Sequence, residues 1–189
     1  MTIGASDLTT LAFVKQWANI QGMGDDTLIQ SLVTAVSSYV PNVLNRQVLT
    51  AQYVDIRNGN GKARMQLRQQ PIQTVSLIEW QGTQINTQVD LMSQTAGVAT
   101  DGRVIFLTGG QYFPQGLPIR ITYTAGWNTC PVDISMAVAE IVAEAYTRRA
   151  HIGQNSTSIG GQTTASYDTK AMHAAIADKL SNYVRVAPL

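Results

Sequence analysis

The residues that could carry out acid-base chemistry in this 189-residue chain are few and scattered. The middle third holds carboxylates that could in principle pair as general acid and general base, namely Asp55, Glu79, Asp90 and Asp101. They lie near turns or on expected strands, where solvated charges are ordinary. The only histidines, His151 and His173, are too few for a histidine-rich metal site. The sequence predicts no catalytic residues and no metal site.

A glycine-rich motif, Gly59-Asn60-Gly61-Lys62, superficially resembles a phosphate-binding loop. A P-loop needs four residues between its glycines and a Ser or Thr after the lysine, and this motif has neither. Asn and Gly both accept positive φ, so residues Asn58 to Gly61 predict an exposed β-hairpin tip instead, with Met65 and Leu67 on the return strand. We therefore expect no cofactor.

Helical spacing of apolar residues marks the start of the chain. Leu8, Leu11 and Val14 predict a first helix, which Asp7 can cap. A second helix is expected to begin at Asp25 or Asp26, either of which can cap it. Pro41 should kink or locally break this second helix, because proline lacks a backbone donor.

A strand, a turn and a helix follow one another between Ile119 and Arg149. Ile119, Ile121 and Tyr123 alternate with polar residues, which is typical of a half-buried strand. Gly126 permits the turn, and the helix that follows has Pro131 in its first turn. It ends at Arg148 and Arg149, where positive charge is favourable.

The intervening residues predict a β region, and those after Arg149 predict a loop and a last helix. Further strands are expected at Val75–Trp80, Gln84–Leu91 and Arg103–Leu107. Residues 152–168 are rich in Ser, Thr, Gly and Gln and predict a flexible segment; a short helix is expected from about Thr169. The fold class is α+β, with a helical core from residues 1–46 and 129–189, a C-terminal tail, and an inserted antiparallel β region at 47–128.

The composition favours a structural protein over an enzyme. Charged residues make up only 13%, while Thr, Gln, Ser and Asn together account for 57 of 189 residues. Such a surface costs less to desolvate than one rich in Lys and Glu, so it suits large contacts between subunits. The net charge of +1 without a basic cluster argues against tight nucleic-acid binding. No stretch is apolar enough to predict a signal peptide or a membrane span.

The order of these pieces resembles the head-tail connector (adaptor) proteins of tailed bacteriophages and gene transfer agents. The resemblance covers most of the chain, and no single piece is diagnostic. The segments that carry it are Tyr123-Thr124-Ala125-Gly126-Trp127, Pro131-Val132-Asp133, Asp25-Asp26-Thr27-Leu28, Asn45-Arg46, Arg68-Gln69-Gln70-Pro71-Ile72 with Val75, and Ser156 to Tyr167.

This resemblance implies a structural virion protein in the neck of the particle, present in the host cytoplasm before assembly. Copies would form a dodecameric ring beneath the portal, extend the DNA channel without sequence-specific DNA binding, and dock a stopper or tail protein. The expected portal-binding residues are Ile159, Tyr167, Tyr183 and Arg185, and Arg148 and Arg149 are expected to contact the portal or neighbouring copies. The alternatives are another neck component, such as a stopper or tail-completion protein, and a hydrolase that uses the β-region carboxylates.

Overall fold

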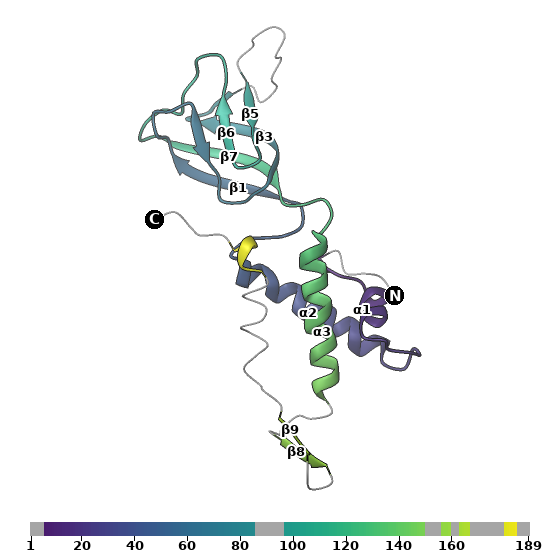
Figure 1. The fold of residues 1–189 in the computed structure, drawn as a ribbon. Coiled ribbons are helices and arrows are strands. Elements are labelled where there is room, and N and C mark those ends of the chain that lie inside the picture. Colours follow the sequence, from purple (N-terminus) through teal and green to yellow (C-terminus); the bar gives the residue numbers. More distant parts are fainter. Residues whose placement is uncertain (1–5, 86–96, 150–155, 160–162, 167–179, 185–189) are drawn as a thin grey trace. The chain divides into compact units, whose positions relative to one another are not determined.

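The computed structural model describes residues 6–85, 97–149, 156–159, 163–166 and 180–184 (Figure 1). The chain forms two compact units. The helical unit comprises Met1–Arg46 and Cys130–Leu189, and the β unit comprises Gln47–Thr129. Helices and antiparallel sheets in one chain confirm the predicted α+β class.

The described residues of the helical unit form three α-helices: α1 (Leu11–Trp17), α2 (Asp26–Leu44) and α3 (Val132–Arg148). Helix α3 contacts both α1 and α2. Helices α2 and α3 each bury residues three or four positions apart, because that spacing returns side chains to one face, whereas α1 buries Val14. The fully buried apolar residues of this unit are Val14, Ile29, Val33, Val40, Leu44, Ile134, Val138, Ala139, Val142 and Leu180.

The N-termini of α1 and α2 differ from the predicted caps. Thr10, in an extended conformation, caps α1, and its Oγ1 accepts a hydrogen bond from the Phe13 N–H at 3.1 Å. The prediction of Asp7 as the cap was wrong, since its carboxylate accepts a bond from the Gln30 amide instead. Asp25 does occupy the N-cap position of α2, but its side chain makes no capping hydrogen bond.

Helix α2 runs through Pro41 to Leu44, so of the predicted kink or break at Pro41, the break does not occur. The helix ends because Asn45 adopts a left-handed conformation with φ 54°. The Arg46 N–H then donates to the Pro41 carbonyl at 3.1 Å, which satisfies a carbonyl left free at the helix end.

Seven strands form two antiparallel sheets in the described part of the β unit (Figure 1). One sheet has the order β1-β7-β3-β4, and the other has the order β2-β6-β5. The bounds are β1 Ala51–Asn58, β2 Arg64–Gln66, β3 Ile72–Trp80, β4 Thr83–Ile85, β5 Val98–Thr100, β6 Val104–Leu107 and β7 Pro118–Ala125. Strand β4 covers the start of the predicted strand Gln84–Leu91, and residues 86–91 lie outside the described residues.

The predicted hairpin at Asn58 to Gly61 does not form. Strand β1 pairs with β7 over eight residue pairs, and β2 pairs with β6 in the other sheet. Gly59 is buried and not an exposed tip, since its N–H donates to the Leu117 carbonyl and its carbonyl accepts from the Gly116 N–H. A Cβ on Gly59 would lie 1.8 Å from the Pro114 carbonyl oxygen, so this glycine permits a close backbone approach.

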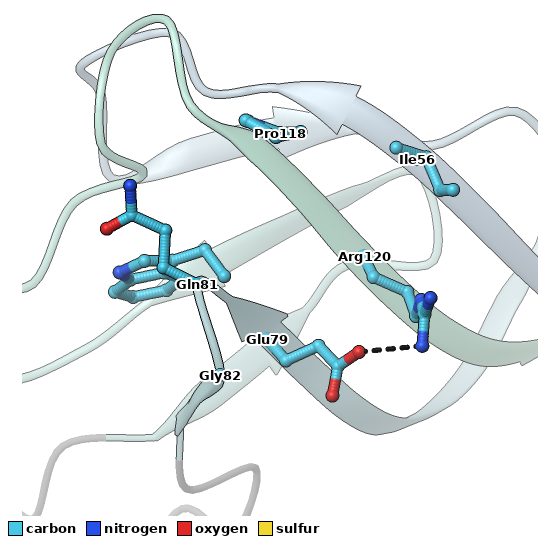
Figure 2. A pocket seen from close by; sticks show the side chains of 7 residues that line it. Ile56, Glu79, Gln81, Gly82, Pro118 and Arg120 are labelled. Atoms are coloured by element: carbon cyan, nitrogen blue, oxygen red, sulfur yellow. Dashed lines mark ion pairs between the residues drawn. The ribbon is translucent and has the colours of Figure 1, made fainter.

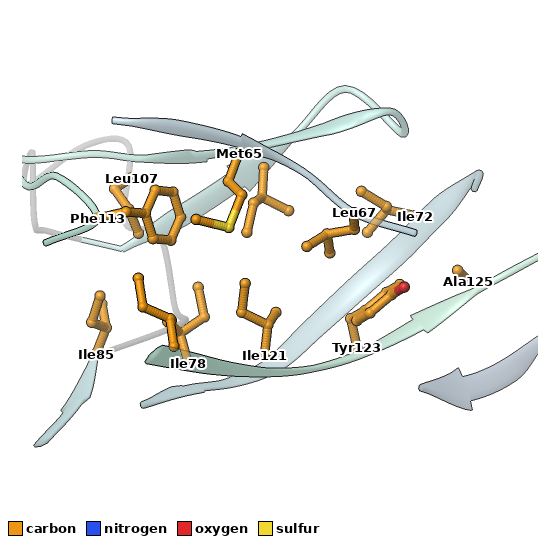
Figure 3. Close-up of a cluster of buried hydrophobic side chains, with 12 residues drawn as sticks. Met65, Leu67, Ile72, Ile78, Ile85, Leu107, Phe113, Ile121, Tyr123 and Ala125 are labelled. Carbon is orange, nitrogen blue, oxygen red and sulfur yellow. The ribbon is translucent and has the colours of Figure 1, made fainter. Parts of the chain in front are cut away.

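Apolar side chains of the two sheets and their connections meet in one core (Figure 3). In Figure 3, Met65 and Phe113 point toward Ile78 and Ile121. The predicted inward alternation of β7 is confirmed, because Ile119, Ile121 and Tyr123 are fully buried. Gly126, which was predicted to permit the turn after this strand, has a φ of 113°.

Part of the segment predicted to be flexible is a hairpin of regular strands. Strands β8 (Ser156–Ile159) and β9 (Thr163–Ser166) pair antiparallel, so the prediction of a loop was wrong for these eight residues. The helix expected from Thr169 falls largely outside the described residues. Its expected end is a 3-10 turn, Ser181–Tyr183, which follows the fully buried Leu180.

Candidate interaction surfaces

The C-terminus of α3 is bonded to the N-terminus of α2 through a surface cluster of three side chains, Asp25, Tyr146 and Arg149. The Tyr146 hydroxyl and the Arg149 Nη2 each donate to Asp25 Oδ2, at 2.6 and 2.8 Å. The Arg149 guanidinium also lies 4.1 Å from the centre of the Tyr146 ring, within cation–π range. The Arg149 and Tyr146 bonds lower the pKa of Asp25, and the Asp25 bond raises the pKa of both donors.

Arg148 and Arg149, expected at contacts with partners, both have partners within their own chain. Arg148 pairs with Glu144 one turn earlier at 2.5 Å. The side chain of Arg149 remains 40% exposed beside Asp25. Either guanidinium can still offer further donors to another protein, because an arginine has five N–H groups and these pairs use few of them.

Tyr183 lies against the helical unit. Its hydroxyl donates to Asp133 Oδ2 at 3.0 Å, and the Arg46 guanidinium lies 5.9 Å from its ring centre. The bond to Asp133 raises the pKa of Tyr183. The turn at 181–183 is thus held at the start of α3 and the end of α2. Of the other expected portal residues, Ile159 ends β8, and Tyr167 and Arg185 lie outside the described residues.

The outer face of the four-stranded sheet carries exposed apolar side chains. Val54 and Ile56 of β1 are 58% and 67% exposed. They lie opposite Thr122 and Arg120 of β7, and Arg120 forms an ion pair of 2.9 Å with Glu79 of β3. A hollow of about 220 Å³ adjoins this ion pair, with Ile56 and Pro118 on its wall (Figure 2). Exposed apolar residues beside a polar rim are typical of protein contact surfaces.

Sequence reasoning did not single out Val54 and Ile56. The pattern from Tyr53 to Arg57 shows alternation, but the side that faces inward is the polar one. Asp55 is only 7% exposed, and its Oδ2 accepts from the Arg68 N–H at 2.9 Å and from the Tyr123 hydroxyl at 3.2 Å. The expectation of a solvated Asp55 was therefore wrong. The sequence does contain a signal for the exposed position of Val54 and Ile56, because no other residue on their face of β1 is apolar.

The other carboxylates of the β region also have structural partners where they are described. Glu79 pairs with Arg120. Asp101 accepts from the N–H groups of Val104 and Arg103, which lower its pKa. Asp90 lies outside the described residues. Burial raises the pKa of the Cys130 thiol to about 11, so it is a poor nucleophile at neutral pH.

Within residues 6–85 and 97–149 and the shorter described segments, no three His, Cys, Asp or Glu side chains gather as metal ligands. In the same part of the chain, no helix has the length and apolar character needed to cross a membrane.

The family model of the Head completion protein matches residues 7–186, which is almost the whole chain. The chain belongs to the Head completion protein family. This confirms the predicted relationship with head-tail connector proteins. No curated protein matches the chain.

Several solved structures share the fold of this family member. A chain in the neck of an empty GTA particle, computed with C6 symmetry, aligns with a TM-score of 0.57 at 14% identity. The alignment covers 95% of that neck chain and 100% of the present chain. A chain in the neck of a native GTA particle, computed with C12 symmetry, aligns with a TM-score of 0.56 at 15% identity. This alignment covers 100% of the present chain and 94% of the neck chain. A chain of the virion of a native gene transfer agent aligns with a TM-score of 0.54 at 16% identity, and the alignment covers 100% of the present chain and 95% of the virion chain.

Proposed function

We propose that this chain is a head-tail connector (adaptor) protein of the particle neck. Twelve copies form a ring beneath the portal, extend the DNA channel and dock the next neck or tail component. The observation that carries the proposal is the match of the Head completion protein family to residues 7–186. It is supported by the shared fold of a chain from a neck computed with C12 symmetry, which fits a twelve-membered ring.

The work of such a ring is binding and not catalysis. The described carboxylates of the β region are occupied by structural bonds, and the Cys130 thiol is protonated at neutral pH. Contacts repeated around a closed ring add up, so a weak contact per copy can give a durable joint. A net charge of +1 suits a channel wall that DNA must pass without being held.

We place the portal contact in the C-terminal third, from Ile152 to Leu189. Tyr167, Tyr183 and Arg185 are the aromatic and arginine residues that interface hot spots favour. The bond of Tyr183 to Asp133 supports this placement, because it holds one of the expected portal residues at a defined point of the helical unit.

Electron microscopy of the protein mixed with the portal of the same particle tests the position. An adaptor gives a ring in direct contact with the portal, whereas a stopper or tail-completion protein binds only when another neck protein is already there. Analytical ultracentrifugation should show a monomer or loose oligomer without portal, because each contact is modest. A stable closed ring at micromolar concentration without portal would contradict this.

Substitution tests the portal contact without loss of the core. Truncation after Arg149 also removes the buried Leu180, so a binding loss from it would be ambiguous. The double variant Tyr167→Ala with Arg185→Ala should weaken portal binding at least tenfold, as for loss of hot-spot anchors. The matched control is Tyr112→Ala, since Tyr112 is exposed on the β unit. Equal portal affinity of the double variant and the control would place the contact elsewhere.

A further inference from the structure

Strand β1 is a long, regular strand at the edge of its sheet. It pairs with β7 through eight consecutive residue pairs without a register shift, whereas the pairing of β3 with β7 is interrupted twice. On its other side, no described strand pairs with it. At the opposite edge of the same sheet, the described part of β4 covers three residues.

This edge lacks most of the features by which soluble proteins protect free strand edges. Its sequence, AQYVDIRN, has no proline and no lysine, and its pairing has no bulge. Asp55 faces inward, but the Arg68 N–H and the Tyr123 hydroxyl bond its carboxylate. The outward side chains Val54 and Ile56 are uncharged and exposed. A strand edge of this kind is a template for another strand.

The β8–β9 hairpin is a small sheet that a further strand would stabilise. It is a sheet of only two strands, four residues each, and no other described strand extends it. Two-stranded hairpins are marginally stable in water unless a third strand or another element packs on them. The strand sequences, STSI and TTAS, are uncharged and rich in residues that favour strands. Because β1 also presents uncharged residues outward, joining the two desolvates no unpaired charge.

We propose that the β8–β9 hairpin of one copy adds to the β1 edge of the next copy in the ring. This inference rests on the proposed adaptor function. Every copy then donates one hairpin and accepts one, which is the heterologous type of contact that closes a ring. Pairing of four residues is a small contact. It therefore holds only when many copies are brought together, as on a portal.

The proposal assigns Ile159 to the contact between copies. The portal contact is left to residues beyond the hairpin, including Tyr167, Tyr183 and Arg185. The two functions of the C-terminal third can therefore be separated by substitution.

Two variants remove one half of the contact each. The edge variant, Val54→Lys with Ile56→Glu, places opposite charges on the exposed face of β1 and leaves the net charge unchanged. Its matched control is Met23→Glu with Val132→Lys, since these residues are 82% and 72% exposed in the helical unit. The hairpin variant, Ser158→Pro with Thr164→Pro, removes backbone donors from a paired position of β8 and β9. Its matched control exchanges the two residues, Ser158→Thr with Thr164→Ser.

Native mass spectrometry of the full-length chain with portal oligomers purified from the same particle counts the copies bound. The wild type and both controls should fill portals cooperatively, leaving mostly empty and complete rings. Each variant alone should bind portal, but its copies should bind independently of one another, so that partly filled rings are common. An equal mixture of the two variants should load in pairs, because the hairpin of the edge variant can still join the intact β1 of the hairpin variant.

The outcomes separate this inference from the adaptor proposal. Cooperative filling by either folded variant, or statistical filling by the mixture, would overturn the strand contact and leave the adaptor function standing. If the wild type does not bind portal, the adaptor function fails and the contact fails with it. Circular dichroism of each variant checks that the substitutions leave the fold intact.

Discussion

The two units of the chain use a carboxylate in opposite ways. In the β unit, Asp55 is buried and joins β1 to the segment before β3, through Arg68, and to β7, through Tyr123. In the helical unit, the side chain of Asp25 is 42% exposed and joins the ends of two helices through Tyr146 and Arg149. The helices are already held by their apolar faces, and the Asp25 cluster on their surface is exposed. The loop after β2 is held by the buried Leu67 and also by the bonds of Asp55, which is itself buried. The same residue type should therefore matter far more in the β unit.

The largest expected effect is that of Asp55→Ala. The change leaves the Arg68 N–H and the Tyr123 hydroxyl without this acceptor in a buried site, and it should cost about 3 kcal/mol of folding free energy. Denaturant unfolding measures the total loss. Hydrogen exchange with mass spectrometry should place it in residues 47–129. A loss below about 1 kcal/mol would mean that buried polar bonds do not hold this unit together.

Much of the fold could be predicted because its signals are local. The alternation of Ile119, Ile121 and Tyr123 and the turn at Gly126 need no knowledge of distant residues. The cap of α1 was misassigned because Asp7 and Thr10 are both good capping residues, and the bond from Gln30 to Asp7 comes from another helix. The Asn-Gly motif misled for a similar reason, since Pro114 and Leu117, far along the chain, determine the conformation of Gly59.

The candidate interaction surfaces were less predictable, because they depend on which face of an element is covered. The outward position of Val54 and Ile56 follows from the inward position of Asp55, whose partner Tyr123 is 68 residues away. The involvement of Tyr183 with Asp133 and Arg46 is equally non-local. The hairpin β8–β9 was missed because Ser and Thr are as common in loops as in strands.

A second prediction concerns the close backbone approach in the β unit. In Gly59→Ala, the new methyl group would overlap the Pro114 carbonyl oxygen, so the backbone must shift, at a cost of about 2 kcal/mol. In the control Gly61→Ala, the nearest atoms are 3.5 Å away and only the positive φ of 69° opposes the change, at about 1 kcal/mol. Thermal unfolding of both variants gives the comparison. Equal losses would show that the Gly59 contact relaxes easily.

A third prediction separates two tyrosines of the β unit, whose rings lie 5.8 Å apart. Tyr123→Phe removes an acceptor from the Gln69 N–H and a donor from Asp55, so it should cost about 1.5 kcal/mol. The buried Tyr53 hydroxyl makes no hydrogen bond within the described residues, and burial raises its pKa. Tyr53→Phe should therefore leave stability unchanged within about 0.5 kcal/mol or increase it. A larger loss in Tyr53→Phe would indicate a partner for that hydroxyl outside the described residues.

The smallest effect is expected at Asp25, in the helical unit, and it should depend on pH. The bonds from Arg149 and Tyr146 hold the pKa of Asp25 below its ordinary value of 3.8. A carboxyl group with a lowered pKa in the folded state stabilises that state above its unfolded pKa, and the stabilisation disappears as the pH falls through the folded pKa. Asp25→Asn should therefore melt slightly below the wild type at neutral pH, and the two curves should coincide once the carboxyl is protonated. High salt should also narrow the gap, because the cluster is exposed. Glu144→Gln, which removes the exposed pair with Arg148, is the matched control. A loss of melting temperature as large as that of Asp55→Ala would contradict the difference proposed between the two units. It would show that the helix ends depend on the Asp25 cluster as strongly as the β unit depends on its buried carboxylate.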